Sequence, residues 1–307
     1  MSLNKPLFLL VMLSLLFAGN NVLAMSSTHF LIPWDNVNSG GLDRSSSTNF
    51  SSTDSIGGTG SGTSTSANFQ LSAGYRAPEG VDTLTYQVSA SSASVSRSYT
   101  GFNAVGNTVT VSSAAGFSVG NLIAVSENAD FSRYVAVGRI SSIVGLVISV
   151  DRFDGDGALM NAVPAGGDDK VFLLNSNSIN FGSIVINIPY TSIVGTSVLS
   201  NVSTGYTLYL LADQELQNAT AQVFSSVADG SVTLGSEEYG AETTGATAFS
   251  SGTDLAVTAT QRIVQTSGAA TGPTSDKIGM VYKLSISPTT NAGTYSQNVY
   301  YTLTANY

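Results

Sequence analysis

The sequence predicts an all-β protein: an antiparallel β-sandwich interrupted by a small inserted β-barrel module and preceded by a flexible amino-terminal arm. Apolar and polar residues alternate at period two in several segments, and Gly, Asn, Asp and Ser separate those segments. Helical patterns are nearly absent, and the best candidate is one or two turns near 213–224. Strands with one apolar and one polar face form antiparallel sheets that pack against each other.

The first 24 residues have the layout of a secretory signal peptide. Lys5 precedes an apolar run from Leu7 to Ala18, and a polar stretch ends in Val22-Leu23-Ala24. The run has about 12 residues, whereas a membrane-spanning helix needs about 20. We therefore expect cleavage after Ala24 and a secreted or cell-surface protein that begins at Met25. The alternative is an uncleaved amino-terminal anchor.

Composition limits the partners that the chain can have. Only 10% of its residues are charged, the net charge is −9, and loss of Lys5 with the signal peptide makes it −10. Nucleic acid and anionic lipid both require clustered Lys and Arg, so neither is an expected partner. The chain has no cysteine and one histidine, His29, which excludes disulfides, thiol catalysis and zinc sites built from these residues.

Residues 25–80 are expected to form the flexible arm. The stretch 38–66 has three large apolar side chains, Leu42, Phe50 and Ile56, among many Ser, Thr and Gly. Such a composition cannot build a core. We interpret this region as a loosely ordered arm or as short strands that lie on a neighbour.

Residues 81–100 and 175–307 are predicted to form one discontinuous sandwich. In the first part, Leu84, Tyr86, Val88 and Ala90 share one face. The segments that continue the sandwich are 176–188, 204–211, 278–286 and 299–305.

Residues 101–174 are predicted to form the inserted barrel, because their strands are shorter and their turns tighter. Exposed loops tolerate insertions at small entropic cost, which suggests that this module could be removed. The strands expected here are 107–112, 122–126, 133–140, 146–150 and 170–174.

One turn in this region resembles a known β-module. Val109–Asn121 contains Gly116-Phe117-Ser118-Val119-Gly120. It resembles a small module of many phage and bacterial surface proteins in which a strand, a GFxVGD-like turn and a second strand recur. Asn121 stands where that pattern usually has Asp, and this departure weakens any role carried over from that Asp.

The amino-terminal region resembles that of uncharacterised secreted surface β-proteins of environmental bacteria, including candidate phyla. That family implies no known activity. The motifs that carry the resemblance are Trp34-Asp35-Asn36-Val37-Asn38-Ser39-Gly40-Gly41, Arg44–Phe50, Asp54-Ser55-Ile56-Gly57 and Ser66–Tyr75.

The carboxy-terminal part is similar in layout to bacterial surface sandwiches of the WxL-like and Ig-like kind. The similarity rests on Ile179–Ser183, Thr204–Leu208 and Gly293-Thr294-Tyr295 before Tyr301–Thr304. It implies a cell-wall-binding domain, although Tyr301 stands where that family has Trp and a second Trp motif is missing. Pilin-like subunits also close on an alternating strand that ends in Tyr, as Tyr307 does here.

Two groups of residues are candidate sites. Asp151, Asp154 and Asp156 are the densest carboxylates, and oxygen ligands on a turning loop are what calcium prefers. Their spacing is not that of an EF-hand, so a solvated turn is the preferred alternative and no cofactor is expected. Phe30 and Trp34 could contact a sugar or a protein, or could dock on their own domain.

The sequence offers no convincing catalytic group. Adjacent Glu237 and Glu238 would point to opposite faces of a strand and could not act together on a glycosidic bond. We therefore expect a non-enzymatic exported surface protein with a structural or adhesive role, whose partners are cell-wall polysaccharide or other surface proteins. The alternatives are a carbohydrate- or wall-binding module, a pilin-like subunit and, last, a hydrolase.

Overall fold

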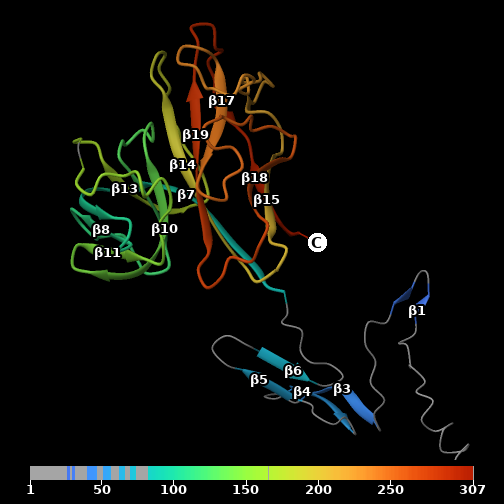
Figure 1. The fold of residues 1–307 in the computed structure, drawn as a ribbon. Coiled ribbons are helices and arrows are strands. Elements are labelled where there is room, and N and C mark those ends of the chain that lie inside the picture. Colours follow the sequence, from blue (N-terminus) through green and yellow to red (C-terminus); the bar gives the residue numbers. More distant parts are fainter. Residues whose placement is uncertain are drawn as a thin grey trace, which may run out of the picture. The chain divides into compact units, whose positions relative to one another are not determined.

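The computed structural model describes residues 82–164 and 166–306 in full, and six backbone strands among the first 81 residues (Figure 1). Those strands pair as three antiparallel hairpins. The predicted arm, 25–80, otherwise lies outside the described residues. The six strands are β1 (Ser26–Ser27), β2 (Phe30–Leu31), β3 (Gly40–Ser46), β4 (Ser51–Ile56), β5 (Gly62–Thr65) and β6 (Gln70–Ala73).

Residues 82–306, as far as they are described, contain strands and connections and no helix. This confirms the all-β, antiparallel prediction. No helix of the described part is long and apolar enough to span a membrane. The strands are β7 (Leu84–Asn103), β8 (Thr108–Val111), β9 (Leu122–Ser126), β10 (Val135–Val144), β11 (Val147–Val150), β12 (Asp154–Gly155), β13 (Lys170–Ser176), β14 (Tyr190–Ser200), β15 (Tyr206–Ala212), β16 (Gln217–Asn218), β17 (Glu238–Thr244), β18 (Arg262–Ser267), β19 (Asp276–Ser285), β20 (Tyr295–Ser296) and β21 (Val299–Ala305).

The helical turns predicted near 213–224 are wrong. This segment contains the short strand β16 and a turn instead. Asn218 Oδ1 accepts hydrogen bonds from the backbone N–H groups of Thr220 and Gln222, and Ala221 has a positive φ of 58°. An asparagine side chain that binds the backbone in this way stabilises a turn at the expense of a helix.

One large antiparallel sheet organises the described part, and some of its strands close into a ring. The strand order is β13-β9-β10-β11-β8-β7-β14-β19-β17, and β12 pairs with β10 off this path. Because β13 also pairs with β7, six strands (β7, β8, β11, β10, β9 and β13) form a closed ring. Figure 1 shows β8, β10, β11 and β13 on one side of β7 and β14, and β15 and β18 on the other.

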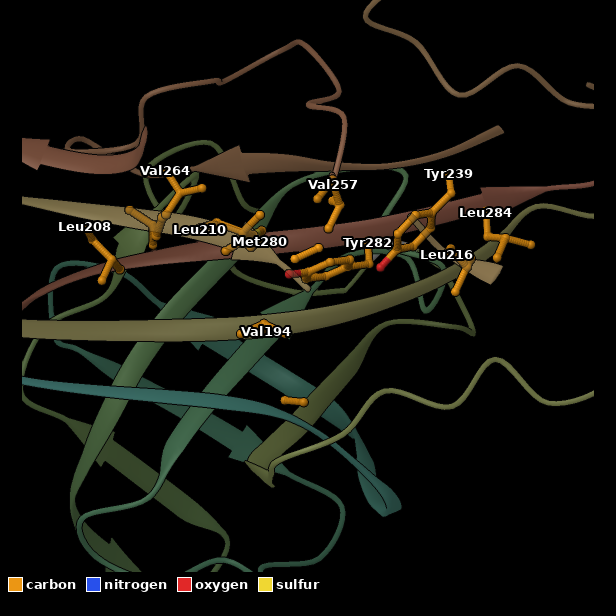
Figure 2. Packing of buried hydrophobic residues seen from close by; sticks show 14 of the residues in the cluster. Val194, Leu208, Leu210, Leu216, Tyr239, Val257, Val264, Met280, Tyr282 and Leu284 are labelled. Carbon is orange, nitrogen blue, oxygen red and sulfur yellow. The ribbon is translucent and has the colours of Figure 1, made fainter. Parts of the chain in front are cut away.

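A second layer covers the part of the sheet that lies outside the ring. It has the order β18-β15-β21. Leu208 and Leu210 of β15 pack with Val264 of β18 against Met280 and Tyr282 of β19 in one buried cluster (Figure 2). β19 alternates as predicted. Its apolar face, which carries Met280, Tyr282 and Leu284, points into this core.

Strand β7 belongs to both the ring and the rest of the sheet. Its first half, Leu84–Ala90, pairs with β14, and its last residues, Tyr99–Asn103, pair with β8. Strand β13 pairs with Ala90 and Ser91 and again with Ser96–Ser98. The predicted boundary between residues 100 and 101 falls inside this continuous strand. The domain boundaries stay a prediction, but the chain does not leave the sheet where they place the insertion.

The predicted strand at 176–188 is wrong beyond Ser176, where β13 ends. Residues 177–189 are irregular, and the strand that pairs with β7 is β14, further along the chain. Gly182 and Asn187 have positive φ values of 69° and 61°, and Pro189 has no N–H to donate to a sheet. Three interruptions in so short a segment prevent regular pairing despite its apolar residues.

The ring and the sheet share a buried cluster. Leu122, Val135 and Val137 of the ring pack in it with Ile193 of β14 and Val281 of β19. The first four of these residues are at most 2% exposed, and Val281 is 5% exposed. Removal of residues 101–174 would uncover Ile193 and Val281. These contacts therefore argue against the expectation that this segment can be excised without loss of stability.

Three tyrosines lie together in the core between the two layers. The hydroxyls of Tyr282 and Tyr301 are 2.7 Å apart, and the rings of Tyr239 and Tyr282 stack with centroids 6.1 Å apart. Figure 2 shows Tyr239 and Tyr282 side by side. Burial raises the pKa of all three hydroxyls above the usual 10.0, most clearly for Tyr239 and Tyr282. The neutral tyrosine is therefore the form that this core accepts.

We predict that the protein loses stability steeply above pH 10. There the unfolded chain releases tyrosine protons that the folded core retains, so each such group lowers the free energy of unfolding by about 1.4 kcal/mol per pH unit. Urea unfolding between pH 8 and pH 12 measures this slope. Tyr301→Phe removes one of these groups, so the free energy of unfolding should fall less steeply with pH, by about 1.4 kcal/mol per pH unit. A slope equal to that of the wild type would contradict the account.

Candidate functional site

The predicted acidic residues lie where the ring meets strand β19. Asp151 follows β11, Asp154 begins β12, and Asp156 follows β12. This places the three carboxylates beside the start of β19, whose first residues are Asp276 and Lys277. The structure therefore brings the acidic loop together with a strand more than a hundred residues further along the chain.

Lys277 is the buried centre of this region. It is 1% exposed, and its Nζ lies 3.0 Å from Asp151 Oδ2 and 3.9 Å from Asp154 Oδ2. Nζ also donates a hydrogen bond of 2.9 Å to the carbonyl oxygen of Ser275. Burial lowers the pKa of Lys277, and Asp151 opposes that shift because its negative charge favours the ammonium form.

Arg152 joins the same loop to β19 by a second route. Its Nε and Nη2 contact the two oxygens of Asp154 at 2.6 and 2.9 Å. Nη2 also contacts Asp276 Oδ1 at 3.0 Å, and Nη1 donates to Thr274 Oγ1 at 3.2 Å. The hydrogen bond to Asp154 is the main reason why the pKa of Arg152 is raised. Bidentate pairs of this kind fix geometry as well as charge.

The network continues from Asp276 into the second layer. The Tyr206 hydroxyl donates to Asp276 Oδ2 at 3.0 Å, and Gln265 Nε2 donates to the Tyr206 hydroxyl at 2.9 Å. Gln265 Oε1 then accepts a 2.6 Å hydrogen bond from Thr196 of β14. Tyr206, Gln265 and Thr196 are fully buried, and burial followed by the charge of Asp276 raises the pKa of Tyr206. We call Asp151, Arg152, Asp154, Asp276 and Lys277, with these three residues, the ionic network.

The carboxylates of the predicted calcium site are engaged within the protein. Asp151 and Asp154 contact Lys277 and Arg152, and Asp156 Oδ2 accepts hydrogen bonds from Val135 N and Thr244 Oγ1 at 3.1 and 3.2 Å. Within the described residues, no three His, Asp or Glu side chains are arranged to hold a metal ion. Calcium at these residues stays a prediction, and a bound cation would have to displace two cationic side chains.

A shallow polar depression of about 640 Å³ lies elsewhere, where β7 leaves its neighbour. Phe172 of β13 pairs with Ser96, but Leu174 pairs with Ser91, so the residues of β7 between them bulge out of the ladder. Such a bulge exposes backbone groups and hydroxyls on one surface. The residues that line the depression, Val88, Ser89, Ser92, Ala93, Asn175, Ser176 and Asn177, include no titratable side chain.

This lining can donate and accept hydrogen bonds but cannot transfer a proton or hold charge. Hydroxyl and amide groups suit a neutral ligand that is rich in hydroxyls, such as a sugar. The depression has no aromatic side chain on which a sugar ring could stack. Its chemistry is that of weak binding.

The remaining candidate residues from the sequence are Phe30, Trp34, Glu237 and Glu238. Phe30 belongs to β2, whose backbone pairs with β1, and Trp34 lies outside the described residues. Glu237 Oε1 contacts the backbone N and the hydroxyl of Ser225, and Glu238 Oε2 accepts from Thr233 N. The two glutamates therefore serve different turns and do not face each other.

Sequence reasoning missed Lys277 and Arg152. It predicted a strand at 278–286 with one apolar and one wet face, and Lys277, which lies on the second side of β19, fell just outside that range. That second face is covered by the ring, with Val281 of the same face buried in the shared cluster. A signal for this was present: Gly279 and Val281 interrupt the polar side of the strand and are typical of a strand that is covered on both faces.

We predict that Lys277→Met lowers the free energy of unfolding by roughly 2–4 kcal/mol, because it leaves Asp151 without its buried cation. Urea unfolding measures the loss. Lys170→Met is the control: Lys170 Nζ donates a 2.8 Å hydrogen bond to Ser98 Oγ, and the loss of this bond should cost about 1 kcal/mol or less. Asp151→Asn added to Lys277→Met should recover part of the loss; equal losses in both lysine variants, or no recovery, would contradict the network.

We predict that calcium does not stabilise the folded protein. A ligand that binds only the native state raises the melting temperature, and here the acidic oxygens already have partners. Millimolar calcium or a chelator should shift the melting temperature by less than about 2 °C. A larger rise with calcium that disappears in Asp156→Asn would show that the loop binds the ion after all.

No family model, no curated protein and no solved structure matches this chain. Its function therefore has to be inferred from the sequence and from the geometry described above.

Proposed function

We propose that this chain is a non-enzymatic, exported bacterial surface protein with a structural or adhesive role. The proposal rests on one observation: the ionisable groups whose pKa values are shifted have their partners within the fold. Lys277, Arg152 and the buried tyrosines bind other groups of the fold, and the polar depression has no titratable lining residue. An active site gathers such groups in an accessible cleft instead.

Lys283, near the other end of β19, also has its partners within the fold. Its Nζ lies 2.7 Å from Glu242 Oε2 and 2.9 Å from Asp254 Oδ1. Burial alone would lower the pKa of Lys283, but the hydrogen bonds to these two carboxylates outweigh burial and raise it. A lysine held as an ammonium by two acids is a poor nucleophile or base. This supports a structural use of the group.

We infer further that the two layers form an Ig-like sandwich and that the closed ring is a small barrel module inserted into it. The support is the cluster between β18-β15-β21 and β19, and the closure of β13 onto β7. The division into 25–80, 81–100 with 175–307, and 101–174 remains part of this proposal. A sandwich without disulfides is stabilised by buried area and polar networks of this kind.

A carbohydrate- or cell-wall-binding module is the second candidate function. The uncharged hydroxyl and amide lining of the depression favours it. A pilin-like subunit is a variant of the structural role, and a hydrolase is the least favoured, because Glu237 and Glu238 bind separate turns.

Export has a direct test. Secreted or surface-released protein should begin at Met25 on amino-terminal sequencing, and protease added to intact cells should degrade it. Ala24→Arg should block processing, because signal peptidase requires a small residue before the cleavage site. Intact protein that begins at Met1 and stays in the membrane would contradict export as a soluble or surface-released chain.

Wall binding is tested at the depression. If it binds neutral polysaccharide, Ser92→Trp should fill it and weaken retention on purified cell wall by about tenfold or more. Thr260→Trp, at an exposed loop position, is the matched control and should bind as the wild type does. Equal retention of both variants, or no retention of the wild type, would remove this candidate.

A further inference from the structure

Strand β21 has one paired and one open edge. It pairs with β15 along its whole length, from Val299 with Ala212 to Ala305 with Tyr206. In the described part of the chain, no strand pairs with its other side. The outer edge of β17, by contrast, is covered, because Ala241 exchanges backbone hydrogen bonds with Leu255 at 2.9 and 2.8 Å.

The backbone groups on the open edge can be identified. Asp213 N donates to Asn298 O at 2.9 Å and Asn306 N donates to Gly205 O at 3.0 Å, just beyond the two ends of the pairing. Hydrogen-bonded and non-hydrogen-bonded pairs alternate along an antiparallel ladder. The even-numbered residues of β21 therefore bond to β15, and the N–H and C=O groups of the odd-numbered residues point outward. Those residues are Val299, Tyr301, Leu303 and Ala305.

The open edge lacks the usual protection against strand pairing. Natural edge strands carry charges, prolines or bulges that prevent association. β21 has the sequence VYYTLTA, with none of these residues, and its register with β15 runs without a shift. β15, YTLYLLA, is also uncharged. On this edge the Tyr86 hydroxyl of β7 donates a 3.3 Å hydrogen bond to Tyr301 O.

We propose that β21 pairs antiparallel with β21 of a second copy of this chain, about a two-fold axis through Thr302. The outward groups then match: those of Tyr301 meet those of Leu303 of the second copy, and those of Val299 meet those of Ala305. Both members of each pair are outward-facing residues, as an antiparallel hydrogen-bonded pair requires. The strand is thus complementary to itself in this register.

The lack of charge along β21 and β15 makes this edge suitable for a second copy. Two copies of a chain with net charge −9 repel each other overall, but at this edge no like charges would face each other. The outer face adds apolar area, because Tyr300 and its cross-strand neighbour Leu211 are 54% and 37% exposed. Pairing places Tyr300 opposite Thr304 of the second copy, which is a favourable cross-strand combination. This inference goes beyond the proposed function and does not depend on it.

The test uses the full mature protein in sedimentation velocity over a range of concentrations. Thr302 is exposed and would face itself across the axis, so Thr302→Lys or Thr302→Glu places like charges opposite each other. Each variant should weaken the dimer by about tenfold, and an equal mixture of the two should restore it. Thr260→Lys is the control for added charge and should dimerise as the wild type does.

An isologous contact is closed, because both copies use the same strand. The wild type should therefore form dimers and no larger oligomers. Tyr86→Phe should strengthen the dimer, since it frees Tyr301 O from its present donor. A wild type that stays monomeric at all concentrations, an open-ended series of oligomers, or a dimer that Thr302→Lys leaves unchanged would each overturn the proposal.

Discussion

The continuity of strand β7 is the constraint on which the rest of this structure depends. A single strand of 20 residues pairs with β14 at one end and with β13 and β8 at the other. The ring can close only because β13 returns to β7, and the layered part can form only because β14 lies beside the first half of the same strand. Between Ser91 and Ser96 the strand bulges out of its ladder with β13, and residues of this bulge line the polar depression.

The ionic network follows from that geometry. Once the ring is placed against β14 and β19, the second face of β19 is buried, and Lys277 on that face needs partners inside the protein. Asp151 and Asp154 supply them, while Arg152 and Asp276 carry the contacts on to Tyr206. In a chain without cysteine, this network and the apolar cluster around Ile193 and Val281 hold the ring against the sheet, beside the continuous strand β7. The acidic loop, for which the sequence suggested a solvated turn or a calcium site, is thus part of the contact between ring and sheet.

Local pattern was enough to predict the strands that have one wet face. The segment at 299–305 matches β21 in both bounds, since alternation and turn residues are local properties. The segment at 122–126 also matches β9 in both bounds, although all five of its residues are buried. What failed was long-range: the loop 177–189 has strand-like composition but is irregular, and the closure of β13 onto β7 leaves no trace in local sequence. Lys277 was missed for the same reason, because only the tertiary contact of ring and sheet buries it.

The most direct test of this account is native-state hydrogen exchange of the backbone amides along β7. If the strand belongs to one cooperative unit, amides in its first half, such as that of Val88, and in its second half, such as that of Phe102, should open with free energies within about 1 kcal/mol of each other. Free energies that differ by several kcal/mol, with the ring half exchanging while the β14 half stays protected, would contradict it. The ring and the sheet would then be two independent units joined by a strand.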